Sequence, residues 1–147
     1  MKTGGAVARL LAPALLALGT ALPAQAGELL GADQLRDQLG GHAVAGYYLA
    51  DKKPFAEAYN PDGSIDYSDT DTSETGHWTV KAGTFCTDYD HMNGGCWYVL
   101  KQGPNCYEFY DANPSGPAPD AEALAGRQPV ARAGRDGSKM TCALPTV

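Results

Sequence analysis

The sequence predicts an all-β protein, built as a small antiparallel meander of about eight short strands with one short helix near its amino end. Three observations favour this class. Short apolar or alternating segments recur at nearly regular spacing, and turns that contain glycine or proline separate them. The stretch 76–110 also holds three of the four cysteines and both tryptophans, as expected for strands stapled around one core. The pattern is compatible with a closed barrel and with a sandwich.

Residues 1–26 have the features of a secretory signal peptide. Lys2 and Arg9 give a positive leading region, an apolar run follows, and small residues precede a cleavage point expected after Ala26. A transmembrane helix is the alternative, but the apolar run is shorter than the roughly 20 residues of a span and contains a proline and a glycine. We therefore expect a periplasmic or secreted protein with a single disulfide-stapled β domain over residues 27–147, and no membrane insertion once the signal is removed.

The charge balance of the chain is acidic. Its formal net charge is −6 at pH 7, and loss of a signal peptide that contains Lys2 and Arg9 makes the remainder more acidic. Nucleic acids and anionic membrane surfaces both require a concentrated positive face, so neither is expected as a partner. The same acidic balance is compatible with a role in solubility alone.

Four cysteines, an even number in an exported domain, predict two disulfides. Cys86 and Cys96 lie on neighbouring strands of one expected hairpin, which favours a bridge between them, and Cys106 would then pair with Cys142; the sequence leaves other pairings open. A zinc site with His91 is the alternative. Zinc sites favour closer pairs such as C-x-x-C, and exported cysteine pairs are normally oxidised, so no metal is expected. The lack of C-x-x-C also argues against redox catalysis.

The first element expected after the signal is a short helix over residues 33–39. Asp33 can cap its amino end, Leu35 and Leu39 share one face, and Gly40-Gly41 ends it. The helix would cover two turns and lie across one end of the fold.

Strand patterns fill most of the remaining chain. Residues 111–120 contain three prolines and predict a surface loop, followed by one helical turn at 121–125. The last two strands are expected to form a hairpin around residues 134–137. The expected strands are 42–49, 55–59, 64–67, 76–81, 84–89, 96–101, 106–110, 128–133 and 138–144.

The polar stretch 68–75 is expected to be an acidic loop. Asp69, Asp71 and Ser73 alternate as the ligands of a calcium loop do. The glycine and glutamate that such a loop needs at its sixth and twelfth positions are absent, so calcium is not expected. A solvated acidic loop explains the composition more simply.

No catalytic motif is present in the sequence. It lacks the nucleophile elbow, the H-E-x-x-H zinc motif, the P-loop and the dinucleotide-binding glycine pattern. Asp62 and Asp66 flank one turn and His77 lies on a strand, so an acid/base role for these residues is the enzymatic interpretation that remains. The simpler interpretation is that Asp62 and Asp66 are ordinary turn residues and that His77 is a solvated strand residue.

Aromatic side chains give the stronger indication of function. A barrel of about eight strands can hold one small ligand or be filled by its own side chains. Tyrosine and tryptophan combine packing area with a polar group, which suits a binding face or a core rim. The ligand-binding candidates are Trp78, Trp97, Tyr98 and Tyr48. A completely filled core with tyrosines around its edge is the simpler alternative.

Several short motifs occur together in the chain: the run 39–46, the hairpin 55–63, Gly76-His-Trp78, Phe85-Cys86, Cys96-Trp97 and the late Cys142. In these motifs residues 31–144 resemble a bacterial exported family catalogued as domain of unknown function 995. The resemblance implies an exported small β domain and supplies no activity or catalytic residues. Gly76-His-Trp78 is also similar to the G-x-W of lipocalins, where the motif lies in the first strand. A calycin-like barrel is thus an analogy of shape, from which function does not follow.

Two classes of function follow from these observations. The first is a periplasmic binding or interaction module whose partner is a small apolar ligand or a periplasmic protein. The second is a small periplasmic hydrolase or other enzyme with an unrecognised site. Because no catalytic constellation is present, we favour the first class and expect no cofactor.

Overall fold

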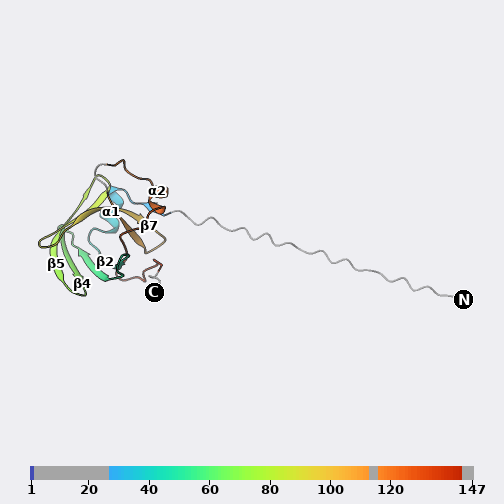
Figure 1. Cartoon of the computed structure of the whole chain (residues 1–147), viewed down its shortest axis with the longest axis horizontal. Coiled ribbons are helices and arrows are strands. Elements are labelled where there is room, and N and C mark those ends of the chain that lie inside the picture. Colours follow the sequence, from blue (N-terminus) through green and yellow to red (C-terminus); the bar gives the residue numbers. More distant parts are fainter. Residues whose placement is uncertain (2–26, 113–115, 144–147) are drawn as a thin grey trace.

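A computed structural model describes residues 27–112 and 116–143, together with Met1. The expected signal peptide lies outside the described residues. Within them the chain forms a closed antiparallel barrel of eight strands, with one extra strand and two short helices (Figure 1). In chain order the elements are β1 (Glu28–Leu29), α1 (Ala32–Gln38), β2 (Ala43–Tyr48), β3 (Pro54–Tyr59), β4 (Ser64–Asp69), β5 (Ser73–Lys81), β6 (Thr84–Tyr89), β7 (Gly95–Lys101), β8 (Tyr107–Asp111), α2 (Ala121–Ala125) and β9 (Ala131–Arg135).

The sheet closes because its last strand pairs with its first. From β2 to β9 each strand pairs with the next along the chain, and β9 also pairs with β2. The extra strand β1 lies outside this ring. Its residues Glu28 and Leu29 pair with the last residues of β7, which do not pair with β6. A closed sheet leaves no free edge in the ring. The expected all-β meander is confirmed, as a barrel rather than a sandwich.

Two backbone features set the path of the ring. The β5–β6 turn has two central residues, Ala82 and Gly83, whose φ angles of 49° and 73° give the twist that a tight hairpin requires. This turn was expected from the sequence. Where β2 pairs with β9, a β-carbon on Gly46 would overlap the carbonyl oxygen of Arg132 and the backbone of Ala133. Glycine at this position therefore allows the two strands to approach and the barrel to close.

The barrel interior is apolar over most of its length. Phe85 lies fully buried within this interior. The rings of Tyr59 and Phe85 pack edge to face with centroids 4.7 Å apart, and the Trp78 ring stacks on the Phe85 ring with centroids 5.4 Å apart. Strand alternation brings Trp78, Val80 and Phe85 to the interior. The buried members of this core are Leu30, Leu35, Leu39, Val44, Phe55, Tyr59, Ile65, Tyr67, Phe85, Val99, Tyr107, Phe109, Ala131 and Ala133.

Helix α1 covers one end of the barrel. Leu35 and Leu39, four residues apart, are fully buried, and the helix lies against β5 and β6. The expected cap is corrected: Gly31 is the N-cap, its backbone N–H donates to the Gln34 side chain at 2.9 Å, and Asp33 lies in the first turn. A carboxylate there is still favourable, because the amino end of a helix carries partial positive charge.

The expected acidic loop is much shorter than the sequence suggested. β4 continues to Asp69 and β5 begins at Ser73, so that only residues 70–72 turn the chain. Asp69 stabilises this turn by accepting hydrogen bonds from the backbone N–H groups of Asp71 (2.8 Å) and Thr72 (2.9 Å). An aspartate that bonds the backbone two residues ahead is a standard turn former, which explains why polar residues here extend a hairpin.

The expected carboxyl-terminal hairpin is wrong. β9 covers Ala131–Arg135, and both of its edges are taken by β2 and β8, so no edge is left to pair with 138–144. The described part of that segment is held instead by the buried Asn105. Its side-chain amide donates to the carbonyl oxygens of Arg135, Ser138 and Lys139 at 3.1–3.3 Å, and its side-chain oxygen accepts from the N–H of Arg135 at 2.7 Å.

Both disulfides join the cysteines that the sequence favoured. Cys86 and Cys96 lie directly opposite each other on β6 and β7 and are bonded. Cys106 is bonded to Cys142 and ties the carboxyl-terminal segment to the beginning of β8. Two disulfides are typical of a protein that works in an oxidising, extracytoplasmic compartment.

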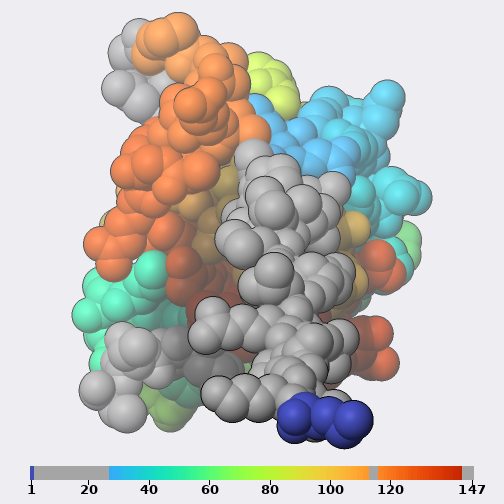
Figure 2. All heavy atoms as spheres, turned by 90° about the vertical axis from the view of Figure 1, so that its right-hand side faces the viewer, coloured from blue at the N-terminus to red at the C-terminus, as the bar shows by residue number. Residues whose placement is uncertain are grey.

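A second, smaller apolar cluster lies on the outer face of the barrel. Leu124 of α2, in the helical turn that the sequence predicts, is fully buried with Leu100 and Tyr110, and Tyr98 packs at the edge of the group. Asp120 caps α2 by accepting from the N–H of Ala123 at 2.8 Å. Figure 2 shows the α2 segment (orange) and the segment that contains α1 (light blue) in the upper part of one face.

Candidate ligand-binding cavity

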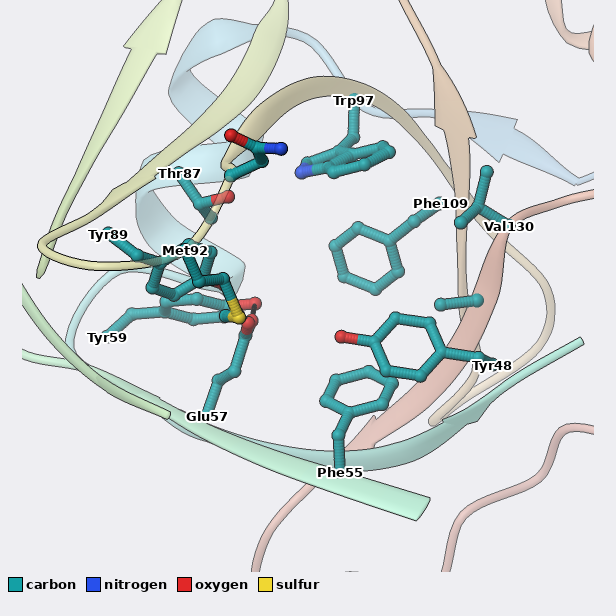
Figure 3. A pocket seen from close by; sticks show the side chains of 12 residues that line it. Tyr48, Phe55, Glu57, Tyr59, Thr87, Tyr89, Met92, Trp97, Phe109 and Val130 are labelled. Carbon is teal, nitrogen blue, oxygen red and sulfur yellow. Dashed lines mark hydrogen bonds between the residues drawn. The ribbon is translucent and has the colours of Figure 1, made fainter. Parts of the chain in front are cut away.

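The end of the barrel opposite α1 contains a cavity of about 200 Å³. Strand direction explains its position: the β3–β4, β5–β6 and β7–β8 turns lie at the α1 end, and the β2–β3, β4–β5 and β6–β7 connections surround the other end. Figure 3 shows the side chains that converge on this space. They are Tyr48, Phe55, Glu57, Tyr59, Thr87, Tyr89, Met92, Asn93, Trp97, Phe109, Val130 and Ala131.

Aromatic rings form much of the cavity wall. Tyr48 and Phe55 stack with centroids 4.7 Å apart and planes inclined by 30°. Trp97 and Phe109 come from the neighbouring strands β7 and β8, and in Figure 3 they face the same space as the stacked pair. The space between these rings is part of the cavity.

A glutamate stands among these rings. Glu57, at the middle of β3, is only 7% exposed. The hydroxyl of Tyr59 donates to one of its carboxylate oxygens, and the hydroxyl of Tyr89 donates to the other. Burial raises the pKa of Glu57, and the two tyrosine hydrogen bonds oppose that rise without cancelling it. The pKa values of Tyr59 and Tyr89 are raised as well, by burial and by the neighbouring carboxylate.

A hydrogen-bonded network fixes the rim of the cavity. The Tyr48 hydroxyl donates to the Tyr67 hydroxyl at 3.3 Å, which donates to Asp69 at 2.8 Å. The ammonium of Lys53 lies 3.0 Å from Asp69 and 2.8 Å from Asp71. The backbone N–H of Asp71 and then Lys53 hold the pKa of Asp69 well below its usual range. The network therefore restrains the Tyr48 ring and balances the rim carboxylates with a lysine.

The β6–β7 connection forms the remaining side of the mouth. Met92 and Asn93 belong to this connection and line the cavity, and Figure 3 shows the Met92 side chain directed into it. The Cys86–Cys96 disulfide joins the strands at its base. Gly94 lies so close to the carbonyl oxygen of Thr87 that a β-carbon would overlap it. The connection is thus held against the barrel at both of its ends.

The four ligand-binding candidates from the sequence lie in three different places. Tyr48 and Trp97 line the cavity. Trp78 lies at the α1 end, where its indole N–H donates to the carbonyl oxygen of Asn60 at 2.8 Å. Tyr98 belongs to the outer cluster, because it follows Trp97 on β7 and consecutive strand residues face opposite sides of a sheet.

The residues considered for an acid/base site lie on the outer surface. Asp62 accepts from the backbone N–H and the hydroxyl of Ser64 within the β3–β4 turn, at 2.9 and 2.7 Å. Asp66 accepts from the Asn60 side chain at 3.0 Å, and His77 is exposed opposite Ser64 on β5. Among the described residues no group of three or more His, Cys, Asp or Glu side chains is arranged to hold a metal ion.

Glu57 is not among the site residues predicted from the sequence, although the sequence contains a signal for it. In the alternating segment 55–59, Phe55, Glu57 and Tyr59 share one face, and two alanines occupy the other. Phenylalanine and tyrosine mark the inward face, so a glutamate in the same phase is directed into the core. A charged residue in that position is uncommon and indicates a functional or structural requirement.

Comparisons with known proteins assign no family to this chain. No protein-family model matches it, and no curated protein matches it either. In the described part of the chain, neither helix has the length and apolar character needed to span a membrane.

We expect Glu57→Gln to stabilise the fold at neutral pH. A carboxyl whose pKa is raised in the folded state costs stability as pH rises from about 4.3, the usual value for glutamate, through the folded pKa. A neutral amide removes this cost. The Tm of the variant should exceed that of the wild type at pH 8 and should match it near pH 4.

Thermal unfolding followed by circular dichroism at both pH values measures this difference. The titratable groups that face Glu57 are Tyr48, Tyr59 and Tyr89, and burial raises the pKa of each of them, so they stay neutral at pH 8. A variant less stable than the wild type at pH 8 would contradict the expectation.

Proposed function

We propose that this protein is a binding module that takes one small, largely apolar molecule into the open end of its barrel, and that it does so in the periplasm or outside the cell. The observation that carries the proposal is the cavity of about 200 Å³ lined by aromatic rings. The two disulfides support an oxidising compartment. Export through residues 1–26 and membership of the 995 family are parts of the same proposal.

The two ends of the barrel differ in a way that favours binding over simple core packing. At the α1 end the rings of Tyr59 and Trp78 each pack directly on Phe85. At the other end Trp97 and Phe109 stand across a space from Glu57. Protein interiors are normally close-packed, and voids larger than a water molecule are few. An aromatic-lined cavity that opens at the barrel mouth therefore suits a ligand.

The size of the cavity limits the ligand. The volume of the cavity is about 200 Å³. Pockets for drug-sized molecules usually measure about 300–1,000 Å³. The space suits a molecule with one ring and a short substituent. Such a ligand would lie between the rings and displace water from apolar surface, which is the main driving force for burial.

Titration with two single-ring probes, benzylamine and benzyl alcohol, tests the proposal. Protein produced from the full gene and purified without reductant is followed by amide and methyl NMR shifts, and its intact mass reports cleavage after Ala26. We expect at least one probe to shift cavity signals such as that of Met92, with millimolar affinity for so small a ligand. Trp97→Ala should weaken binding at least about tenfold through lost aromatic contact.

Tyr98→Ala is the matched control, because it removes an aromatic ring from the next position on β7 but on the outer face. It should leave the affinity of the bound probe unchanged. If neither probe shifts cavity signals of the wild-type protein, the binding proposal is overturned. A response equally sensitive to both substitutions would place the binding elsewhere and overturn it as well.

A further inference from the structure

The barrel contains two buried glutamates, and they differ in their partners. Glu108 on β8 and Glu57 on β3 are each 7% exposed. Glu108 faces Arg132 across the β8–β9 pair, with the guanidinium Nε 2.8 Å from its carboxylate. Among the described residues, the hydrogen-bond partners of Glu57 are the hydroxyls of Tyr59 and Tyr89. Buried carboxylates are normally neutralised by a basic group, because removing an unpaired charge from water is costly.

None of the twelve described side chains that line the cavity is a lysine, arginine or histidine. Lys53, a basic residue of the β2–β3 connection at the rim, is engaged by Asp69 and Asp71. The charge that would balance Glu57 is therefore not supplied by the cavity wall. An ionised carboxylate offers about four acceptor positions, and the tyrosine hydroxyls use two of them. The others can accept from a donor that enters the cavity, toward which the carboxylate points in Figure 3.

The geometry points to a small organic cation as the ligand: we propose that the cavity selects single-ring primary amines, with Glu57 as counter-ion and the aromatic wall around the cationic group. This inference rests on the binding function proposed above and specifies its ligand class. The tyrosine hydroxyls position the carboxylate before the ligand arrives, since each one holds a different oxygen. Pre-positioned acceptors reduce the ordering cost of binding.

The aromatic rings of the cavity wall also favour a cationic ligand. The faces of tyrosine, phenylalanine and tryptophan rings attract cations, most strongly when water is excluded. Trp97, Phe109 and the stacked pair Tyr48–Phe55 line the space beside Glu57. An aromatic cage with one carboxylate is a recurrent arrangement for ammonium groups. A neutral ligand of the same size would gain the apolar contact but neither the ion pair nor the cation–π attraction.

The charge of the whole chain also favours a cation. Without Lys2 and Arg9 the formal charge of −6 becomes −8 for residues 27–147. A negative protein raises the local concentration of small cations and repels anions of the same size. The effect is not specific, but it acts in the same sense as the Glu57 site.

Three probes of nearly equal size and different charge test the inference: benzylamine, benzyl alcohol and benzoate. We expect the wild-type protein at pH 7.5 to bind benzylamine at least about tenfold more tightly than benzyl alcohol, as for a charge-assisted hydrogen bond, and to bind benzoate most weakly. Glu57→Gln should lower the affinity for benzylamine at least about tenfold. Its affinity for benzyl alcohol should change less than about twofold, which also shows that the variant is folded.

Asp66→Asn is the control for charge alone, because it removes one carboxylate from the exposed outer face of β4. It should leave benzylamine affinity within about twofold of the wild type. Equal affinities for benzylamine and benzyl alcohol, or a benzylamine affinity unaffected by Glu57→Gln, would overturn the assignment of a cationic ligand and keep the binding proposal. Absence of binding by all three probes would overturn both.

Discussion

Replacing Cys106 and Cys142 together by serine is expected to lower the free energy of unfolding by roughly 4 kcal/mol. The bridge joins residues 36 apart, and the cost of closing a loop in the unfolded chain grows with its length. Small domains have only about 5–15 kcal/mol in total, so the variant should be close to unfolding at 37 °C. Urea unfolding of the oxidised protein and of the variant measures the difference.

The Cys86–Cys96 pair provides the matched comparison. It joins residues 10 apart, for which the same relation gives roughly 3 kcal/mol. The longer bridge also holds a segment that has no strand pairing, where Asn105 supplies most of the hydrogen bonds. Loss of the longer bridge should therefore destabilise more. A larger effect of removing Cys86–Cys96 would contradict this order and place the weak point of the fold at the cavity mouth.

The strands that could be predicted from sequence are those whose ends carry local signals. The strand 84–89 was bounded correctly because Gly83 readily adopts the positive φ angle of a tight turn, which is a local property of glycine. The hairpin around Asp62-Gly63 was found for the same reason. Trp78 and Phe85 both face the interior of the barrel, but alternation alone does not tell which face of a strand is the inward one.

The errors fall where distant residues decide the structure. Glycine is typical of turns, but Gly134 lies inside β9, because that strand closes the ring by pairing with β2 and β8. The stretch 138–144 then has no edge to join. Likewise, residues 73–75 are polar and acidic and were expected in a loop, yet they continue β5 because pairing with β4 satisfies their backbone groups.

The candidate site was only partly accessible to sequence reasoning. Tyr48 and Trp97 were chosen as aromatic residues of a barrel, and the structure brings them to one cavity. Trp78 and Tyr98 were chosen on the same grounds and lie elsewhere, because residue type does not reveal which end or face of a barrel a side chain occupies. The importance of Glu57 depends on the absence of a basic neighbour in the cavity wall, and that is a property of residues far apart in the chain.

The two tryptophans should respond to substitution in opposite ways, and this is the second large effect we expect. Trp78→Ala should lower the free energy of unfolding by about 3 kcal/mol or more. Its ring stacks on the buried Phe85, its N–H donates to the Asn60 carbonyl oxygen, and Gly40 lies against its edge with no room for a side chain. Truncation would leave a void at the closed end of the barrel and remove one of the two hydrogen bonds that the Asn60 carbonyl oxygen accepts, the other coming from the N–H of Gly63.

Trp97→Ala should cost much less stability, about 1 kcal/mol, because one side of its ring already faces the cavity and makes few contacts there. Its effect should fall on probe binding instead. Urea unfolding and benzylamine titration of both variants measure the two quantities separately. If Trp78→Ala impaired binding at full stability, or if Trp97→Ala destabilised the protein as strongly as Trp78→Ala, the cavity end would be part of the filled core. The distinction between a packed closed end and a ligand-accepting open end would then fail. That distinction requires Trp78 to contribute to stability and Trp97 to contribute to binding.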